Sequence, residues 1–294
     1  MVRNPMRFGV HVFLTEESMG AAEMATAVED RGLDALWLPE HTHIPTSRRT
    51  PYPPGGELPD EYRRCVDPFI GLAVAAAVTS RIRLGAGVIQ AALRDPIVTA
   101  KAVASLDLYS NGRVEVGVGV GWNEDEIADH GVNFTRRREV AREHVLAMQA
   151  LWEHDEAEFH GEFVNFDSSW SWPKPQQTDG RGRRGVPVLL GGAAGPKLFS
   201  QIVEYGSGWM PLAGGGLTAG VQRLRELATA AGRDPDELAV IPFGSTPGHD
   251  KFDYFESLGI GEVIFNLPWG SRDVVLPALD RLAGFVAERR GTAA

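Results

Sequence analysis

The sequence predicts one α/β domain of the (β/α)8 barrel class over residues 1–294. A short apolar run, a Gly-rich or polar turn and an amphipathic segment follow one another eight times along the chain. Apolar runs such as "VPVLL" (186–190) do not alternate with polar residues, which is typical of parallel strands buried on both faces. No break in composition marks a second domain. Eight such units therefore favour a closed barrel over an open sheet.

Each unit pairs an expected strand with an expected helix. In the first half the pairs are Arg7–Val12 with Ala21–Arg31, Ala35–Leu38 with Pro68–Thr79, Ile82–Val88 with Ile97–Tyr109, and Arg113–Val118 with Arg136–Trp152. In the second half they are Val186–Leu190 with a helix beginning near Pro196, Gly208–Met210 with Thr218–Ala231, Leu238–Ile241 with Phe252–Leu258, and Glu262–Asn266 with Val274–Arg289. Gly32 suits the end of the first helix, and Pro96 suits the first turn of the third.

Two connections are longer than the rest. Ile44–Arg64 follows the second strand, so we expect it above the mouth of the barrel, where catalytic groups gather in this fold. His154–Gly185 leaves the fourth helix and therefore starts at the opposite end; it either folds back as a small hairpin or contributes to an interface. Trp170 and Trp172 are expected to pack within this second loop.

Composition restricts the partners. The chain carries 29 Lys and Arg against 39 Asp and Glu, a net charge of −10, which disfavours nucleic acid. Cys65 is the single cysteine, and neither a signal peptide nor an apolar run long enough to span a membrane is present. We therefore expect a cytoplasmic protein that acts on a small molecule and has no membrane partner.

Candidate functional residues stand where strands end. The strand ends supply His11, then Glu40, His41 and His43, then Gly87, Val88 and Gln90, then Gly119, Gly121, Trp122 and Asn123, then Gly191, Gly192, Ala193 and Gly195, and finally Asn266. The Gly-rich turns in "GVGVGWNEDE" and "LLGGAAGPKL" either bind a phosphate or simply make tight turns. "GVGVG" is not a dinucleotide fingerprint, because it ends the fourth strand rather than the first.

Two self-sufficient chemistries are disfavoured. The segment from Glu40 to His43 offers a His-x-His pair, but the ends of strands five and six supply no further metal ligand. None of the four lysines lies in or at the end of a strand, which argues against a Schiff-base enzyme. We therefore predict no metal, and a histidine with amides, apolar walls and anion-binding turns suits a bound organic cofactor.

With these residues in view, the sequence resembles the luciferase-like family of flavin- and deazaflavin-dependent barrel enzymes. The resemblance lies in "AVEDRGLDALWLPEH", "TSRIRLGAGV", "DPIVTAKAVASLDLYSNGRVEVGVGVGW" and "VPVLLGGAAGPKLFSQIVEYGSGWM", which occur in this order and at the family's spacing. It covers nearly the whole chain. Within the family, the sequence is most similar to the branch that uses the deazaflavin coenzyme F420.

The resemblance implies a role for each strand end. His41, beside Glu40, would face the cofactor ring as proton donor or acceptor, and a bulge with a non-proline cis peptide bond would fall at Gly87-Val88. The turns at 119–123 and 192–196 would hold the ribityl chain and the phosphate. The cofactor-binding residues so implied are Glu40, Gly87, Val88, Gln90, Gly119, Gly121, Trp122, Asn123, Gly192, Ala193, Gly195 and Pro196.

Three functions follow as hypotheses. The first is hydride transfer between F420 and a small organic substrate. The second is an FMN-dependent monooxygenase supplied by a separate reductase, and the third is a barrel that binds a cofactor without catalysis. Trp122 departs from the sugar-phosphate dehydrogenase branch, which has an acid there, so a sugar phosphate is in doubt; Trp122 either walls an apolar pocket or packs as core. Homodimers are common in the family, but a homodimer cannot be derived from this sequence.

Overall fold

The computed structural model describes residues 5–179, 181–212 and 216–291. The first half comprises β1 (Arg7–His11), α1 (Ala21–Asp30), β2 (Ala35–Leu38), η1 (Asp60–Arg63), α2 (Pro68–Val78), β3 (Arg83–Gln90), η2 (Ala91–Leu93), α3 (Pro96–Ser110), β4 (Val114–Gly119), α4 (Glu124–Asp129), η3 (Phe134–Arg136) and α5 (Arg137–Glu153). The second half comprises β5 (Glu156–His160), β6 (Asn165–Trp170), β7 (Val188–Gly191), α6 (Pro196–Tyr205), β8 (Gly208–Met210), α7 (Leu217–Ala230), η4 (Pro235–Glu237), β9 (Ala239–Val240), β10 (Phe243–Ser245), α8 (His249–Ser257), β11 (Glu262–Asn266) and α9 (Arg272–Arg290).

The helices begin where the sequence provides caps. Asp67 accepts hydrogen bonds from the backbone N–H groups of Phe69 and Ile70, and Pro68 occupies the first turn of α2. Asp95 and Pro96 play the same two parts at the start of α3. A carboxylate cap satisfies N–H groups that have no partner within the helix, and proline has no N–H to satisfy. Both helices therefore start at fixed positions: α3 starts shortly after β3, and α2 starts after the long connection that follows β2.

The strands form a parallel sheet that curls around an axis. Within the described residues, nine strands lie in the order β10-β11-β1-β2-β3-β4-β7-β8-β9. The two strands at the ends of this order, β9 and β10, are separated in the chain by only Ile241 and Pro242. The N–H of Ile241 donates to the carbonyl of Trp209 in β8, and the carbonyl of Pro242 accepts the N–H of Ile264 in β11. One short segment thus joins both edges of the sheet. The carboxyl ends of the strands all face the same side.

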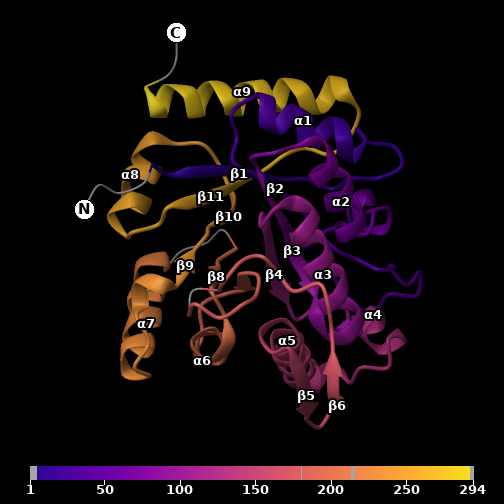
Figure 1. The fold of residues 1–294 in the computed structure, drawn as a ribbon. Helices are drawn as coiled ribbons and strands as arrows, with labels where there is room; N and C mark the ends of the chain where they lie inside the picture. The colour runs from indigo at the N-terminus through magenta and orange to yellow at the C-terminus, as the bar shows by residue number, and fades with distance from the viewer. Residues whose placement is uncertain (1–4, 180, 213–215, 292–294) are drawn as a thin grey trace.

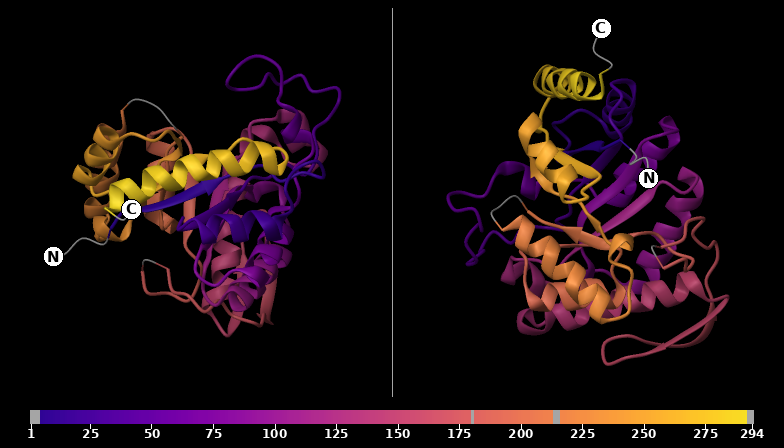
Figure 2. Two further views of the ribbon diagram at one scale, coloured as in Figure 1. Left: turned by 90° about the horizontal axis from the view of Figure 1, so that it is seen from above. Right: turned by 90° about the vertical axis from the view of Figure 1, so that its left-hand side faces the viewer.

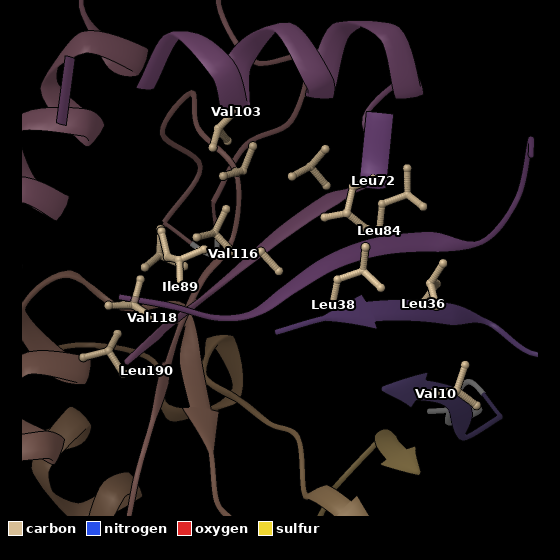
Figure 3. Packing of buried hydrophobic residues seen from close by; sticks show 14 of the residues in the cluster. Val10, Leu36, Leu38, Leu72, Leu84, Ile89, Val103, Val116, Val118 and Leu190 are labelled. Atoms are coloured by element: carbon tan, nitrogen blue, oxygen red, sulfur yellow. The ribbon is translucent and has the colours of Figure 1, made fainter. Parts of the chain in front are cut away.

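Two layers of apolar side chains hold the sheet. On its outer face, Val10, Leu36 and Leu84 pack with helix residues such as Leu72 of α2 and Val103 of α3 (Figure 3). The inner face carries a smaller cluster formed by Ala35, Trp37, Leu189, Met210, Ile241, Phe243 and Ile264. Because successive residues of a strand point to opposite faces, β2 contributes to both layers and all its residues are buried.

Trp37 explains why the third strand is rich in glycine. Its fully buried indole lies against β3, and a Cβ atom at Gly85 would overlap the indole ring. A Cβ at Gly87 would approach the same ring to 2.7 Å. Side chains at either position would displace the tryptophan that fills the interior of the curled sheet.

The long connection after α5 contains an antiparallel pair, β5 and β6, so the hairpin alternative holds. The pair lies at the opposite end of the molecule from α9 (Figures 1 and 2). Trp170 and Trp172 contact other residues of this loop but remain 77% and 55% exposed. Trp170 donates to Glu156, and the ring of Trp172 lies near Lys174 and Arg184. Besides the short 3-10 helices η1 to η4, the sequence did not lead us to expect α4 and β10; α4 lies in the acidic run after the fourth strand. In the described residues no helix is long and apolar enough to cross a membrane.

Candidate active site

A cavity of about 520 Å³ opens at the carboxyl ends of the strands. Its size is typical of a site for a cofactor or a small substrate. The lining residues come from β1, β3, β4, β7, β8, β10 and β11, and from the connections after β1, β2, β4, β7 and β8. They are His11, Phe13, Pro39, Glu40, His41, Pro54, Tyr62, Gly87, Val88, Gln90, Gly119, Val120, Gly121, Trp122, Gly191, Gly192, Met210, Leu212, Phe243, Gly244 and Asn266.

Most of the sequence-predicted residues meet in this cavity. Those that line it are His11, Glu40, His41, Gly87, Val88, Gln90, Gly119, Gly121, Trp122, Gly191, Gly192 and Asn266. Asn123 does not line it: the side chain is fully buried, and neither amide atom has a hydrogen-bond partner among the described residues. Ala193, Gly195 and Pro196 lie outside it, at the start of α6, where Ala193 and Pro196 are exposed.

His41 is held by a buried carboxylate. Its Nδ1 lies 2.8 Å from Oε2 of Glu126, whose side chain is fully buried. The other Glu126 oxygen, Oε1, accepts a hydrogen bond of 2.8 Å from the side-chain amide of Gln90 and one of 3.3 Å from the N–H of Thr42. A carboxylate only accepts hydrogen bonds, so Nδ1 must carry the proton in this contact. The other ring nitrogen of His41, Nε2, is then the atom left to exchange a proton.

A second buried carboxylate, Glu40, orders the same end of the site. Glu40 forms an ion pair with Arg94, and its Oε2 accepts the backbone N–H of Gln90 at 2.7 Å. Arg94 also binds Asp67, the cap of α2. Burial of Glu40 is therefore compensated by a cation and a hydrogen bond, as a buried charge requires. The network fixes the end of β3 against the end of β2.

Val88 projects into the cavity between glycines. The strand register shifts between Ala86 and Ile89, and the peptide bond between Gly87 and Val88 is cis, as the resemblance implies. A Cβ atom at Gly119 would lie 2.5 Å from Cγ2 of Val88, and one at Gly191 would lie 3.0 Å from its Cγ1. These glycines of β4 and β7 make room for the valine, which then presents an apolar surface inside the cavity.

The connection after β2 covers one side of the mouth and is fixed to α4. Arg49 binds the carboxylate of Asp125 through its backbone N–H, at 2.8 Å, and through its guanidinium. Two tyrosines of this connection, Tyr52 and Tyr62, meet at their hydroxyl groups, 3.1 Å apart. Both rings lie near the aromatic groups of the site: Tyr62 is 5.3 Å from His41, and Tyr52 is 6.0 Å from Trp122. Burial raises the pKa of Tyr62 above its ordinary value, which keeps the hydroxyl protonated.

His11 lies at the end of β1 and contributes a second, different histidine. Burial lowers its pKa to about 4, although a hydrogen bond with Asn266 opposes this shift. The ring is therefore neutral at pH 7, and it stands 4.8 Å from the ring of Phe243. The site thus has one histidine beside a carboxylate and another among aromatic and amide groups.

The residues fit a planar ring cofactor with a phosphorylated side chain. Val88, Met210 and Phe243 give apolar surfaces, whereas His41, Gln90 and Asn266 supply polar groups. The buried Oε1 of Gln90 has no hydrogen-bond partner among the described residues and can accept one. The cap of α6 is Gly195, which has no side chain to satisfy the first N–H groups of the helix. Such an end suits an anion, provided the ligand reaches it from the cavity at Gly192.

Two residues that contact His41, Glu126 and Tyr62, were not expected from the sequence, and neither were the apolar lining residues such as Met210 and Phe243. Glu126 belongs to an acidic run that is typical of a solvent-exposed helix start, yet it is fully buried beside His41. Tyr62 lies in a proline-rich loop without a motif of fixed chemical meaning. The one signal that pointed toward Glu126 was its place just after the Gly-rich end of the fourth strand. No group of three or more His, Cys, Asp or Glu side chains is placed to hold a metal ion in the described part of the chain.

Comparison with known proteins identifies the class. The family model for luciferase-like monooxygenases matches residues 6–247, and the chain belongs to this family. Relatives include F420-dependent oxidoreductases, among them an F420-dependent glucose-6-phosphate dehydrogenase of Kineococcus radiotolerans. That protein is 28% identical, over 80% of this chain and 66% of its own length.

Two further relatives show how far the likeness extends. An uncharacterized protein of Mycobacterium tuberculosis is 41% identical over 96% of this chain and 99% of its own length. Among solved structures, an F420-dependent secondary alcohol dehydrogenase in complex with an F420-acetone adduct superposes with a TM-score of 0.73. It is 19% identical, covering 98% of this chain and all of the other, so this likeness concerns the fold alone.

Proposed function

We propose that the protein is an oxidoreductase that transfers a hydride between coenzyme F420 and a small organic substrate. The observation that carries this proposal is the pairing of His41 with the buried carboxylate of Glu126 at the polar edge of an otherwise apolar cavity. The F420-dependent relatives support the choice of cofactor. A ketone that accepts a hydride also takes up a proton, and an alcohol that donates a hydride also loses one. His41 is placed to supply or remove this proton.

When bound, a deazaflavin ring supplies or accepts the hydride at its C5 position. The chain's own residues orient the ring and handle the proton. Val88 and Met210 would support the ring by contact, and Gln90 would hydrogen-bond its polar edge. Glu126 holds the Nδ1 proton of His41, so that Nε2 receives the substrate's proton in one direction and returns it in the other. The two tyrosines of the β2 connection reduce access of water to His41.

The test is oxidation of reduced F420 in the presence of a panel of enones, imines and ketones. Turnover is expected with the wild-type protein and should fall at least about tenfold in His41→Ala, as for loss of a general acid or base. His43→Ala is the matched control. His43 belongs to the same connection but is exposed and contacts Asp129 rather than the cavity, so turnover should be unchanged. Equal turnover in wild type and His41→Ala would remove His41 from the mechanism.

The alternative is an FMN-dependent monooxygenase that receives reduced flavin from a separate reductase. The family model, which describes monooxygenases, favours keeping this candidate. It predicts oxygen consumption on addition of reduced FMN and a substrate, without oxidation of F420. A chain that binds a cofactor and turns over none of the substrates would instead be a binding protein.

A further inference from the structure

A second cavity adjoins the candidate active site. Its volume is about 390 Å³, and it lies between the end of β8, the start of α7, β10 and α8. The two cavities share three wall residues, Leu212, Phe243 and Gly244. The ring of Phe243 lies 4.8 Å from the ring of His11 in the central cavity, and Phe243 also borders the second cavity. A ligand lying against Leu212 and Phe243 can therefore extend from one cavity into the other.

The second cavity combines apolar walls with one cation. Pro211, Leu212, Leu217, Pro242, Phe243 and Phe255 supply apolar surface, and Ser245, Thr246, Tyr254 and Lys251 supply polar groups. Among the described residues that line it, Lys251 is the single charged side chain. In a protein with a net charge of −10, a cavity that has a cation and no carboxylate among its described lining residues favours an anionic ligand.

The ammonium group of Lys251 is positioned but not saturated. Its Nζ donates to the carbonyl of Thr246 at 2.9 Å and to Oγ1 of the same residue at 2.6 Å. A lysine ammonium has three N–H donors, so one donor is left over after these two contacts. The hydroxyl of Tyr254, on the same helix, is bound to Oγ1 of Thr218 at 2.5 Å, which links α8 to the start of α7.

The apolar rim gives a second, independent indication of a ligand. Leu212 is 65% exposed although it borders both cavities, and Tyr254 beside Lys251 is 41% exposed. Exposed apolar groups around a concave site are typical of surfaces that a ligand covers.

We propose that this second cavity binds the anionic end of the substrate, and that the substrate is an organic anion with an apolar body. The carboxylate or phosphate would meet Lys251, and the apolar body would pass Leu212 and Phe243 into the central cavity. The carbon that exchanges the hydride would lie at the end remote from the anion. That the bound anion is the substrate rests on the proposed function. The binding itself does not depend on which cofactor the protein uses.

Octanoate and octan-1-ol are suitable probes, because they share a chain length and differ in charge. Calorimetric titration of the full-length protein should detect octanoate binding, and Lys251→Met should weaken it at least about tenfold, as for loss of a charge-assisted hydrogen bond. Binding of octan-1-ol should change less than about twofold, since apolar contact is retained. Arg281→Met, which removes one exposed cation on α9, is the matched control and should leave octanoate binding unchanged.

Lys251 also supports the segment at Thr246, so Lys251→Arg separates charge from local structure. This variant should keep octanoate binding to within about threefold, because a guanidinium also binds carboxylates. Equal losses in the Met and Arg variants, an unchanged octanoate affinity in Lys251→Met, or no octanoate binding to the wild type would each overturn the proposal.

A last arm separates the substrate from the cofactor as the source of the anion. F420 with its glutamyl tail and the tail-less deazaflavin should each bind Lys251→Met as they bind the wild type. A loss confined to tailed F420 would assign Lys251 to the cofactor and overturn the substrate assignment. If neither deazaflavin binds the wild type, the proposed function fails, while the octanoate result still decides the fate of the second cavity.

Discussion

Replacement of Glu126 by glutamine tests the arrangement around His41 directly. The change keeps the shape of the side chain but removes its charge and turns one acceptor oxygen into an amide donor. In the wild-type protein the two carboxylate oxygens accept hydrogen bonds of 2.8 Å from His41 and Gln90. The substituted amide can accept from only one of these two groups, so either His41 or Gln90 can no longer donate to it, and the Nδ1 proton of His41 is no longer held by a charge.

The expected size of the effect follows from these contacts. A hydrogen bond to a charged group contributes about 1.5–3 kcal/mol. If the loss falls on the transition state, it lowers kcat by about 10- to 150-fold. Cofactor affinity should change little, because Glu126 does not line the cavity. A split between an altered kcat and a nearly unaltered cofactor Kd is therefore expected, and a merely structural role would not produce it.

The assay is steady-state oxidation of reduced F420 by wild type and Glu126→Gln, with thermal unfolding measured on the same samples. Asp129→Asn is the matched control, because this acid lies on the same helix but is exposed and contacts His43. A kcat for Glu126→Gln within about threefold of the wild type, with the fold intact, would refute the reasoning.

Three further predictions follow. Burial and the neighbouring charge of Glu115 raise the pKa of Glu262 from 4.5 to about 7, so the folded state binds more protons than the unfolded state. The free energy of unfolding should therefore fall as pH rises from about 4.5 through 7. Measured by urea unfolding, it should depend less on pH in Glu262→Gln. Gly119→Val should abolish cofactor binding, measured by fluorescence, because a Cβ there would lie 2.5 Å from Cγ2 of Val88. The helix α2 has no charged residue, and its Ile70 and Val74 are 67% and 42% exposed, so we expect this face to form a homodimer. Replacing both residues by aspartate should convert the dimer to a monomer in light-scattering measurements. A monomeric wild type would contradict this expectation.

The sequence was sufficient to predict the elements whose signals are local. β2, β8 and β11 match the expected strands residue for residue, because each is an apolar run bounded by Gly, Pro or polar residues. The start of α3 matches within one residue, since Pro96 is recognisable as part of the first turn of a helix. Most strand-end site residues also meet as expected, because the carboxyl ends of parallel strands face the same side.

The parts that could not be predicted depend on contacts between distant segments. Glu126 and His41 are 85 positions apart, and their contact exists only because α4 packs beside the connection after β2. The break between β9 and β10 arises where one segment leaves β8 and joins β11. Asn123 looked like a residue of the Gly-rich turn, but its position before α4 directs its side chain into the interior.

The proposal that F420 is the cofactor has one most direct test. The purified protein is titrated in parallel with F420 and with FMN, and the fluorescence of each cofactor is followed at equal protein concentration. We predict saturable binding of F420, with FMN binding at least about tenfold weaker. Saturable binding of FMN together with no measurable binding of F420 would contradict the proposal.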